Sequence, residues 1–258
     1  MNYKAVLADM DGTINRGDTL IAGADDVYRE LSEAGVRWLF LSNNGSTLAS
    51  YLASKITRLG LPVSEDQVIN SASALIREVT RNFVHSRIMV VGQPRLIQGL
   101  EGVGVTITDD PSDTDIVVVA LDRYFTYEKL KRAHRAIQMG ALFWATNLDA
   151  TYPEADGFSP GAGSVVASIS TAAGKQPDRV FGKPSTDMAE LALERLGLEA
   201  SACLVVGDRM DTDVEFARRA GMSSVLVLTG ATSMTDLPKY SFSPKYILDS
   251  IADLGKLF

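Results

Sequence analysis

The chain has 258 residues, of which 46% are hydrophobic and 22% are charged, and its formal net charge is -7. This length suits a core domain that carries an insert, and the hydrophobic fraction argues against disorder. The excess of acidic residues argues against nucleic acid as a partner, because too few cationic side chains remain to neutralise a phosphate backbone.

Cysteine content and hydropathy indicate the compartment. The chain has one cysteine, Cys203, which excludes an intramolecular disulfide. The apolar run after Met1 is short and soon meets acidic residues, unlike a signal peptide. No run of about 18 apolar residues occurs, so no membrane partner is predicted. These features favour a cytoplasmic protein.

Short apolar runs alternate with segments of helical periodicity along the chain. Strands are predicted at residues 4–8, 37–41, 88–91, 116–120, 142–145, 202–206 and 224–228. Helices are predicted at residues 24–34, 47–59, 71–82, 126–139, 164–173, 186–196 and 212–220, with a long loop at 146–163. Ser64-Glu-Asp-Gln67 fits a capping box. Alternating strands and helices predict a doubly wound α/β fold, whose ligands bind at the carboxyl ends of the strands.

Four aspartates follow two of the predicted strands. Asp9 and Asp11 come after the first strand, and Asp208 and Asp213 come after the strand at 202–206. Two unit charges about 4 Å apart repel by about 4 kcal/mol at an effective dielectric near 20, so such a cluster requires a cation. Ligands that are all oxygen favour Mg²⁺ over zinc. Lys183, which opens a later helix, supplies a second positive charge.

A phosphate site is predicted beside this cluster. Ser42, Asn43, Asn44 and Gly45 follow the second strand, where a hydroxyl and the N–H groups of a turn can hold a phosphate. Phosphorus would then be open to attack by the Asp9 carboxylate, giving an aspartyl-phosphate. The carboxyl group of Asp11, two residues further along, can protonate the leaving oxygen and later activate water.

Each of these motifs is common in turns and helix caps, but their joint occurrence at strand ends is not. Together they resemble the four motifs of the haloacid dehalogenase superfamily, over about residues 1–82 and 179–228. The resemblance implies that Asp9 is the nucleophile, Asp11 the general acid and base, Ser42 a phosphate ligand and Lys183 a charge-stabilising lysine. It also implies that Mg²⁺ is held by Asp9, the Asp11 main-chain carbonyl and Asp208, with Asp213 in support.

The insert between Ser42 and Lys183 resembles a class II, subtype A cap, an α/β domain over the active site. The implied domains are a core at residues 1–82 and 179–258 and a smaller α/β cap at 83–178. The segments 145–149 and 160–163 are similar to the group that includes p-nitrophenylphosphatase, N-acetylglucosamine-phosphate phosphatase, pyridoxal phosphatase and phosphoglycolate phosphatase. Tyr152 stands where the pyridoxal phosphatase pattern has a histidine, which argues against vitamin B6 phosphate as the main substrate.

The predicted partner is therefore a small phosphate ester, a sugar, polyol or cofactor phosphate, with p-nitrophenyl phosphate as an in vitro substrate. Leaving-group contacts are predicted for Asn147, Asp149 and Tyr152 in the long loop. An exposed edge of the insert's sheet would offer a surface for a homodimer.

Three alternatives differ in chemistry. A dehalogenase needs an aspartate nucleophile but neither a metal nor a second acid at Asp11, so the acidic set favours phosphoryl transfer. A phosphomutase would need a cap between Asp11 and Ser42, where little room exists. A non-catalytic protein that binds phosphorylated metabolites stays open, and turnover of p-nitrophenyl phosphate with and without Mg²⁺ separates it from an enzyme.

Overall fold

The computed structural model of the protein describes residues 3–154 and 157–258, and the chain divides into two compact units. The first unit comprises the residues up to Ser42, Ala49–Ile69 and Lys183–Phe258, and the second comprises Asn43–Leu48 and Asn70–Gly182. The division falls near residues 70 and 182, whereas the sequence places it near 82 and 179. Helix α3 (Ser71–Asn82) belongs to the second unit because it packs there with α4 (Pro94–Glu101).

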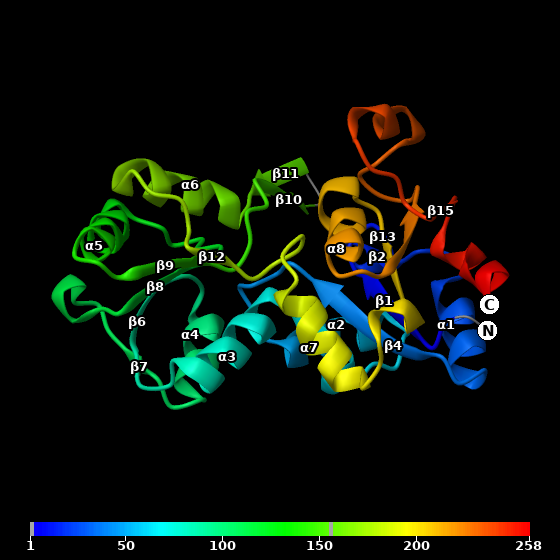
Figure 1. Ribbon diagram of the computed structural model, residues 1–258, viewed down its shortest axis with the longest axis horizontal. Helices are drawn as coiled ribbons and strands as arrows, with labels where there is room; N and C mark the ends of the chain where they lie inside the picture. Colours follow the sequence, from blue (N-terminus) through cyan, green and yellow to red (C-terminus); the bar gives the residue numbers. More distant parts are fainter. Residues whose placement is uncertain (1–2, 155–156) are drawn as a thin grey trace. The chain divides into compact units, whose positions relative to one another are not determined.

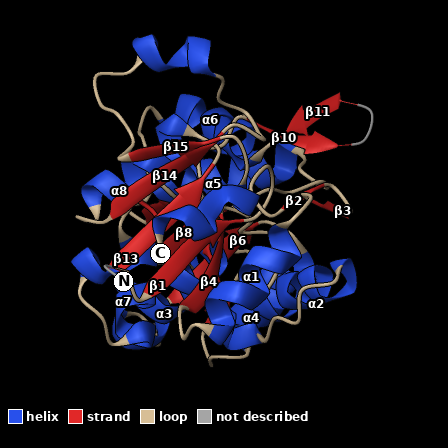
Figure 2. Ribbon diagram, turned by 90° about the vertical axis from the view of Figure 1, so that its right-hand side faces the viewer, coloured by secondary structure: helices blue, strands red, loops and turns tan. Residues whose placement is uncertain are grey.

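The first unit contains a six-stranded sheet in the order β15-β14-β13-β1-β4-β5. Its strands are β1 (Ala5–Asp9), β4 (Arg37–Ser42), β5 (Val68–Asn70), β13 (Cys203–Gly207), β14 (Ser223–Val227) and β15 (Tyr246–Leu248). Strand β1 pairs in parallel with both β13 and β4, and Figure 2 shows them side by side with β14 and β15.

Helices cover both faces of this sheet. They are α1 (Ala24–Glu33), α2 (Ala49–Leu59), α7 (Asp187–Leu196) and α8 (Glu215–Arg219). Alternate strand residues point to opposite faces, so Val6, Phe40 and Val206 share one buried cluster with residues of α1 and α2. A short hairpin of β2 (Asn15–Arg16) and β3 (Thr19–Leu20) follows β1.

The second unit has its own five-stranded sheet, in the order β12-β9-β8-β6-β7. The strands are β6 (Arg87–Val91), β7 (Thr106–Ile107), β8 (Ile116–Val119), β9 (Leu142–Ala145) and β12 (Arg179–Val180), and all their pairings are parallel. Figure 1 shows α5 (Tyr127–Gln138) and α6 (Ala162–Ala173) on one face of this sheet and α3 and α4 on the other. The predicted α/β class with parallel sheets is confirmed in both units.

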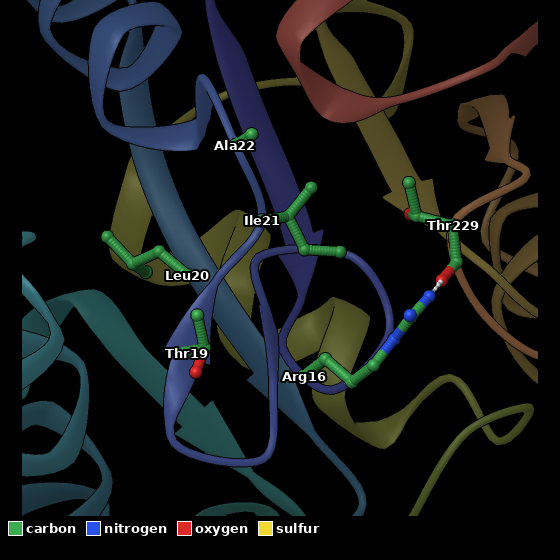
Figure 3. A pocket seen from close by; sticks show the side chains of 6 residues that line it. All are labelled: Arg16, Thr19, Leu20, Ile21, Ala22 and Thr229. Atoms are coloured by element: carbon green, nitrogen blue, oxygen red, sulfur yellow. Dashed lines mark hydrogen bonds between the residues drawn. The ribbon is translucent and has the colours of Figure 1, made fainter.

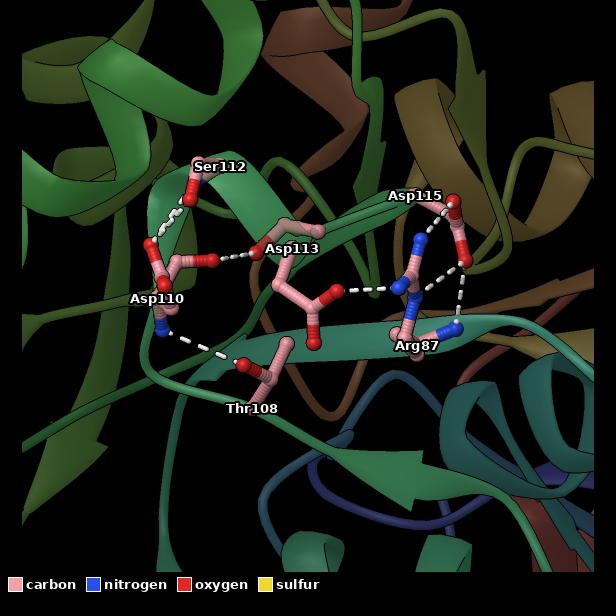
Figure 4. Close-up of polar contacts among 7 residues, drawn as sticks. Arg87, Thr108, Asp110, Ser112, Asp113 and Asp115 are labelled. Carbon is pink, nitrogen blue, oxygen red and sulfur yellow. Dashed lines mark hydrogen bonds and ion pairs between the residues drawn. The ribbon is translucent and has the colours of Figure 1, made fainter.

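An ion-pair network ties two strands of the second unit at their amino ends. The Arg87 backbone N–H donates to Asp115 Oδ2 at 2.7 Å, and the Arg87 guanidinium pairs with Asp113 and Asp115 (Figure 4). The network is exposed, so it adds little to the free energy of unfolding. Asp113 and Asp115 thus have Arg87 as their common partner.

Some elements differ from the sequence prediction. Helix α4 was not predicted, and the expected loop at 146–163 contains a hairpin of β10 (Thr151–Glu154) and β11 (Gly157–Pro160). The expected helix at 212–220 is a π-helix, Met210–Val214, continued by α8. The capping box at Ser64 and Gln67 is confirmed. Among the described residues, no helix is long and apolar enough to cross a membrane.

Candidate active site

Three carboxylate side chains meet at the carboxyl end of the first unit's sheet. Asp9 ends β1, Asp208 directly follows the neighbouring strand β13, and Asp213 lies in the π-helix after that strand. One oxygen from each carboxylate lies within 4.8 Å of the others. Negative charges this close repel one another, so the cluster requires a compensating cation.

Lys183 supplies part of that compensation. Its Nζ donates to Asp9 Oδ1 at 2.5 Å and to Asp213 Oδ1 at 2.6 Å, and its side chain is 3% exposed. Burial disfavours the charged ammonium, but Asp213 and Asp9 outweigh burial and raise the pKa of Lys183. The lysine is therefore a permanent cation between two carboxylates.

The Asp208 carboxylate fits a metal ligand. Its Oδ2 accepts a hydrogen bond from the backbone N–H of Ala231 at 2.6 Å. Its Oδ1 is buried and meets no hydrogen-bond donor in the part of the chain that the structure describes. A buried carboxylate oxygen without a donor is costly unless a cation approaches it. Together with Asp9 and Asp213, it offers the all-oxygen ligand set that Mg²⁺ prefers.

Burial also acts on the protonation of the carboxylates. It raises the pKa of Asp9 well above its ordinary value, and Asp213 and Asp208 add to this while Lys183 opposes it. Burial, followed by the charge of Asp213, raises the pKa of Asp208 to about 6. Without a metal, the cluster therefore resists carrying its full negative charge.

Glycines let two loops approach Asp208 closely. A Cβ added at Gly12 would lie 2.6 Å from Asp208 Oδ2, and the φ of Gly12 is +92°, which side chains rarely adopt. A Cβ at Gly230 would overlap the same carboxylate. The loop from Thr229 to Thr232 is also tied to Asp208 by the Thr232 N–H, which donates to the Asp208 carbonyl at 3.1 Å. These contacts set the orientation of the Asp208 side chain.

The Asp11 carboxylate has a separate set of partners. Its Oδ1 accepts a hydrogen bond from Asn15 Nδ2 at 2.8 Å and lies 3.6 Å from Lys55 Nζ. The Asp11 side chain is 50% exposed, in contrast to the buried Asp208 and Asp213. Asp11 is thus held on one side and open to solvent on the other.

The residues predicted to bind phosphate fall in both units. Ser42 ends β4 in the first unit and is buried. The next three residues, Asn43, Asn44 and Gly45, form a turn of the second unit. The Asn43 carbonyl accepts a hydrogen bond from Ser71 Oγ at 2.9 Å and another from Asn147 Nδ2. A Cβ at Gly45 would overlap Thr146, so only glycine fits there.

Two of the predicted leaving-group residues lie beside this turn within the second unit. Asn147 Nδ2 donates to the Asn43 carbonyl at 2.7 Å, and Asn43 Nδ2 donates to Asp149 Oδ2 at 3.1 Å. Tyr152 has a different neighbour, because its hydroxyl accepts from Arg123 Nη2 at 2.7 Å. Tyr152 and Arg123 line a cavity of about 630 Å³ that also includes Ser159, Ser164 and Ser168 among its walls.

A second cavity, of about 420 Å³, lies beside the β2–β3 hairpin of the first unit. Arg16, Thr19, Leu20, Ile21, Ala22 and Thr229 line it (Figure 3). Arg16 donates to the Thr229 carbonyl and thereby ties the hairpin to the loop that holds Asp208. None of the predicted site residues lines this cavity.

Sequence reasoning missed several residues that surround the acidic side chains. These are Asn15, Lys55 and the loop at Thr229–Thr232, all of which contact Asp11 or Asp208. Asn15 lies four residues after Asp11, a spacing that signals a turn and could have suggested the contact. Lys55 and the loop are distant in sequence, so no local pattern indicates them.

The sequence matches known protein families and relatives. Residues 6–106 match the family model of haloacid dehalogenase-like hydrolases, and residues 180–254 match a model described as HAD-hydrolase-like. The chain is 33% identical to the sugar-phosphatase AraL of Bacillus subtilis, over 98% of this chain and 92% of that protein.

Solved structures agree with the sequence comparison. A p-nitrophenyl phosphatase from Archaeoglobus fulgidus is 31% identical, with a TM-score of 0.94 and 100% of both chains covered. A glycerol phosphate phosphatase from Mycobacterium tuberculosis, in complex with magnesium, is 35% identical with a TM-score of 0.90, covering 98% of this chain and 76% of that one. The similarity thus extends through both units.

Proposed function

The chain belongs to the haloacid dehalogenase-like hydrolase family and is a phosphatase of small phosphate esters, and we propose that Asp9 is its nucleophile. The observation that carries this proposal is the position of Asp9 between a buried lysine and two further carboxylates. Asp9 ends strand β1 with its side chain 14% exposed, and its Oδ2 would be the attacking oxygen because Oδ1 is held by the lysine.

The proposed reaction has two displacements at phosphorus. An Asp9 oxygen attacks phosphorus, the bond to the ester oxygen breaks, and its electron pair goes to the leaving alcohol, which takes a proton from Asp11. A water molecule then attacks the aspartyl-phosphate and gives a proton to Asp11. The bond from phosphorus to Asp9 breaks, which releases inorganic phosphate and restores the carboxylate.

We assign the metal to the acidic cluster. Asp9 and Asp208 would hold Mg²⁺ through their carboxylates, with the Asp11 main-chain carbonyl as a further ligand and Asp213 in support. When bound, Mg²⁺ neutralises charge on the phosphoryl oxygens. The buried and unsatisfied Asp208 Oδ1 supports this assignment, as does the magnesium complex of the similar glycerol phosphate phosphatase.

The phosphate group would be held by residues of the chain itself. Lys183 supplies a positive charge, the Ser42 hydroxyl a hydrogen bond, and the backbone N–H groups of Asn43, Asn44 and Gly45 an anion-binding turn. Lys183 is already held by Asp9 and Asp213, which orients its ammonium toward the attacking carboxylate.

We further propose that the second unit acts as a cap that selects the leaving group. Sugar and polyol phosphates are the favoured substrates, because the similar proteins include a sugar phosphatase and a glycerol phosphate phosphatase. Asn147, Asp149 and Tyr152 carry the amide, carboxylate and hydroxyl groups that recognise alcohol groups.

Replacement of the nucleophile tests the proposal. Asp9→Asn should abolish hydrolysis of p-nitrophenyl phosphate in Mg²⁺ while its thermal unfolding stays close to that of the parent. Acid quenching with ³²P-labelled substrate should trap label on the parent protein and none on the variant. The control is Asp25→Asn, which changes an exposed carboxylate on α1 and should keep full activity. Substantial turnover by Asp9→Asn would exclude Asp9 as the nucleophile.

A further inference from the structure

We propose that Asn15 is a positioning residue that holds Asp11 in the orientation from which it protonates the leaving group. The inference rests on the proposed function, in which Asp11 is the general acid. It concerns a residue outside the four motifs, on the first strand of the β2–β3 hairpin.

The backbone brings Asn15 back to the acidic loop. The Asn15 N–H donates to the Met10 carbonyl at 3.0 Å, and the Gly12 N–H donates to the Asn15 carbonyl at 2.7 Å. The chain between Met10 and Asn15 therefore forms a closed turn around Asp11. Asn15 is completely buried within it.

The Asn15 side chain forms its hydrogen bonds through its amide nitrogen and not through its amide oxygen. Asn15 Nδ2 donates to Asp11 Oδ1 at 2.8 Å and to the Gly17 carbonyl at 3.0 Å. Because a carbonyl can only accept, the second bond fixes which atom of the amide is the nitrogen. The Asn15 oxygen is buried and finds no donor among the residues described, so the two N–H bonds are what this side chain contributes.

These contacts leave the two oxygens of Asp11 unequal. Oδ1 is engaged by Asn15 and faces the Lys55 ammonium at 3.6 Å, whereas Oδ2 has no partner in the described part of the chain. The Asn15 N–H bond and the nearby ammonium both occupy the Oδ1 side of the carboxyl group, so Oδ2 is the oxygen left to meet a leaving group. Asn15 thereby presents Oδ2, on a half-exposed side chain, as the donor.

This arrangement matters most for poor leaving groups. An alkyl phosphate expels a strongly basic alkoxide unless the ester oxygen receives a proton as the bond to phosphorus breaks. A p-nitrophenyl ester expels a stable anion and needs no such proton. The value of kcat/KM covers only the steps up to release of the first product, so it does not include the later attack of water on the aspartyl-phosphate. A loss of kcat/KM that is specific to the alkyl ester therefore reports on proton donation by Asp11.

The test compares two variants of similar size with one control. Asn15→Leu removes the donor, and Asn15→Asp keeps the shape but replaces the N–H group with an acceptor. The control is Thr19→Ala on the same hairpin, an exposed side chain without a hydrogen bond to the described residues. For both Asn15 variants, kcat/KM for glycerol phosphate should fall about tenfold or more relative to that for p-nitrophenyl phosphate, within the range of general acid catalysis.

The mutual dependence of the two residues supplies the second measurement. In an Asp11→Asn background, Asn15→Leu should leave the ratio of the two kcat/KM values unchanged, because no acid remains to be positioned. Equal losses for both esters, or no loss, would contradict the proposal, and so would a gain for glycerol phosphate. The proposed function fails separately, through turnover by Asp9→Asn. Should Asn15→Leu fail to fold, Asn15→Asp gives the same comparison.

Discussion

Lys183 Nζ lies 2.6 Å from Asp213 Oδ1, and both side chains are almost completely buried. The same ammonium reaches Asp9, so one lysine partly neutralises a cluster of three carboxylates. The site is thus built around one buried cation that offsets the mutual repulsion of three neighbouring carboxylates.

Removal of the lysine should therefore destabilise the metal-free protein. Lys183→Met leaves buried carboxylates without their cation, and we expect the free energy of unfolding in EDTA to fall by about 3–5 kcal/mol. Urea unfolding measures this change, and Mg²⁺ should recover part of it. The control is Lys175→Met, which breaks an exposed pair with Asp178 and should cost no more than about 1 kcal/mol. Similar losses in both variants would contradict the buried-pair explanation.

Metal binding should depend on pH through Asp208. In the metal-free protein its pKa is raised to about 6, so the folded state keeps a proton that the unfolded state has already lost. The stability of the metal-free protein falls as pH rises toward 6, because the carboxylate must then be charged in a buried site. Mg²⁺ requires the charged form, so its affinity should rise between pH 5 and about 7 and then level off.

Calorimetric titration with Mg²⁺ at several pH values checks this prediction. Asp208→Asn should remove most of the affinity and only part of the pH dependence, because the pKa of Asp9, a second proposed ligand, is also raised. An affinity for Mg²⁺ that is constant from pH 5 to pH 8 in the parent protein would exclude Asp208 as the titrating ligand.

A change at Gly230 should damage the site without altering any charge. Gly230→Ala places a methyl group against the Asp208 carboxylate, which must turn away. We expect Mg²⁺ affinity to fall about tenfold or more, within the range found when groups that orient metal ligands are changed. Gly255→Ala is the control, since its nearest neighbour is the end of the Glu30 side chain at 3.6 Å. Unchanged affinity in Gly230→Ala would show that Asp208 needs no such close approach.

Much of the fold was predictable because its signals are local. Strands such as β1 and β13 are short apolar runs, and their parallel pairing follows from the helices between them. Since parallel strands end at the same edge of a sheet, the approach of Asp9 and Asp208 also follows from the sequence. Helix α4 was missed because it is short and lies between two strands of the second unit.

The remainder of the site depends on contacts that no local pattern encodes. Lys55 reaches Asp11 from α2, and the Ala231 N–H reaches Asp208 from a loop after β14. Both contacts join segments far apart in the chain, so they arise only when the sheet is assembled. Tyr152 was predicted to contact the leaving group. Its hydrogen bond with Arg123 was not predicted, because the sequence shows residues 146–163 only as a loop and gives no sign of which segment packs against it.

The pair of Arg123 and Tyr152 leads to a prediction about specificity. Both Arg123 Nε and Nη2 donate to the Tyr152 hydroxyl, at 3.2 Å and 2.7 Å, in the wall of the larger cavity. Tyr152→Phe keeps the ring but removes the acceptor, which frees guanidinium N–H groups to bind other oxygens. If this cavity selects the leaving group, the ratio of kcat/KM between sugar phosphates and glycerol phosphate should change by up to about tenfold, because one hydrogen bond contributes about 0.5–1.5 kcal/mol.

Activity toward p-nitrophenyl phosphate and the melting temperature should stay close to those of the parent, because the acidic cluster is unchanged. The matched control is Tyr127→Phe, which removes a hydroxyl from a side chain that is 76% exposed on α5. A panel of phosphorylated sugars and polyols, assayed with both variants, measures the ratios. An identical panel for Tyr152→Phe and Tyr127→Phe would show that the hydroxyl held by Arg123 has no part in choosing the substrate, and would leave Asn147 and Asp149 to account for it.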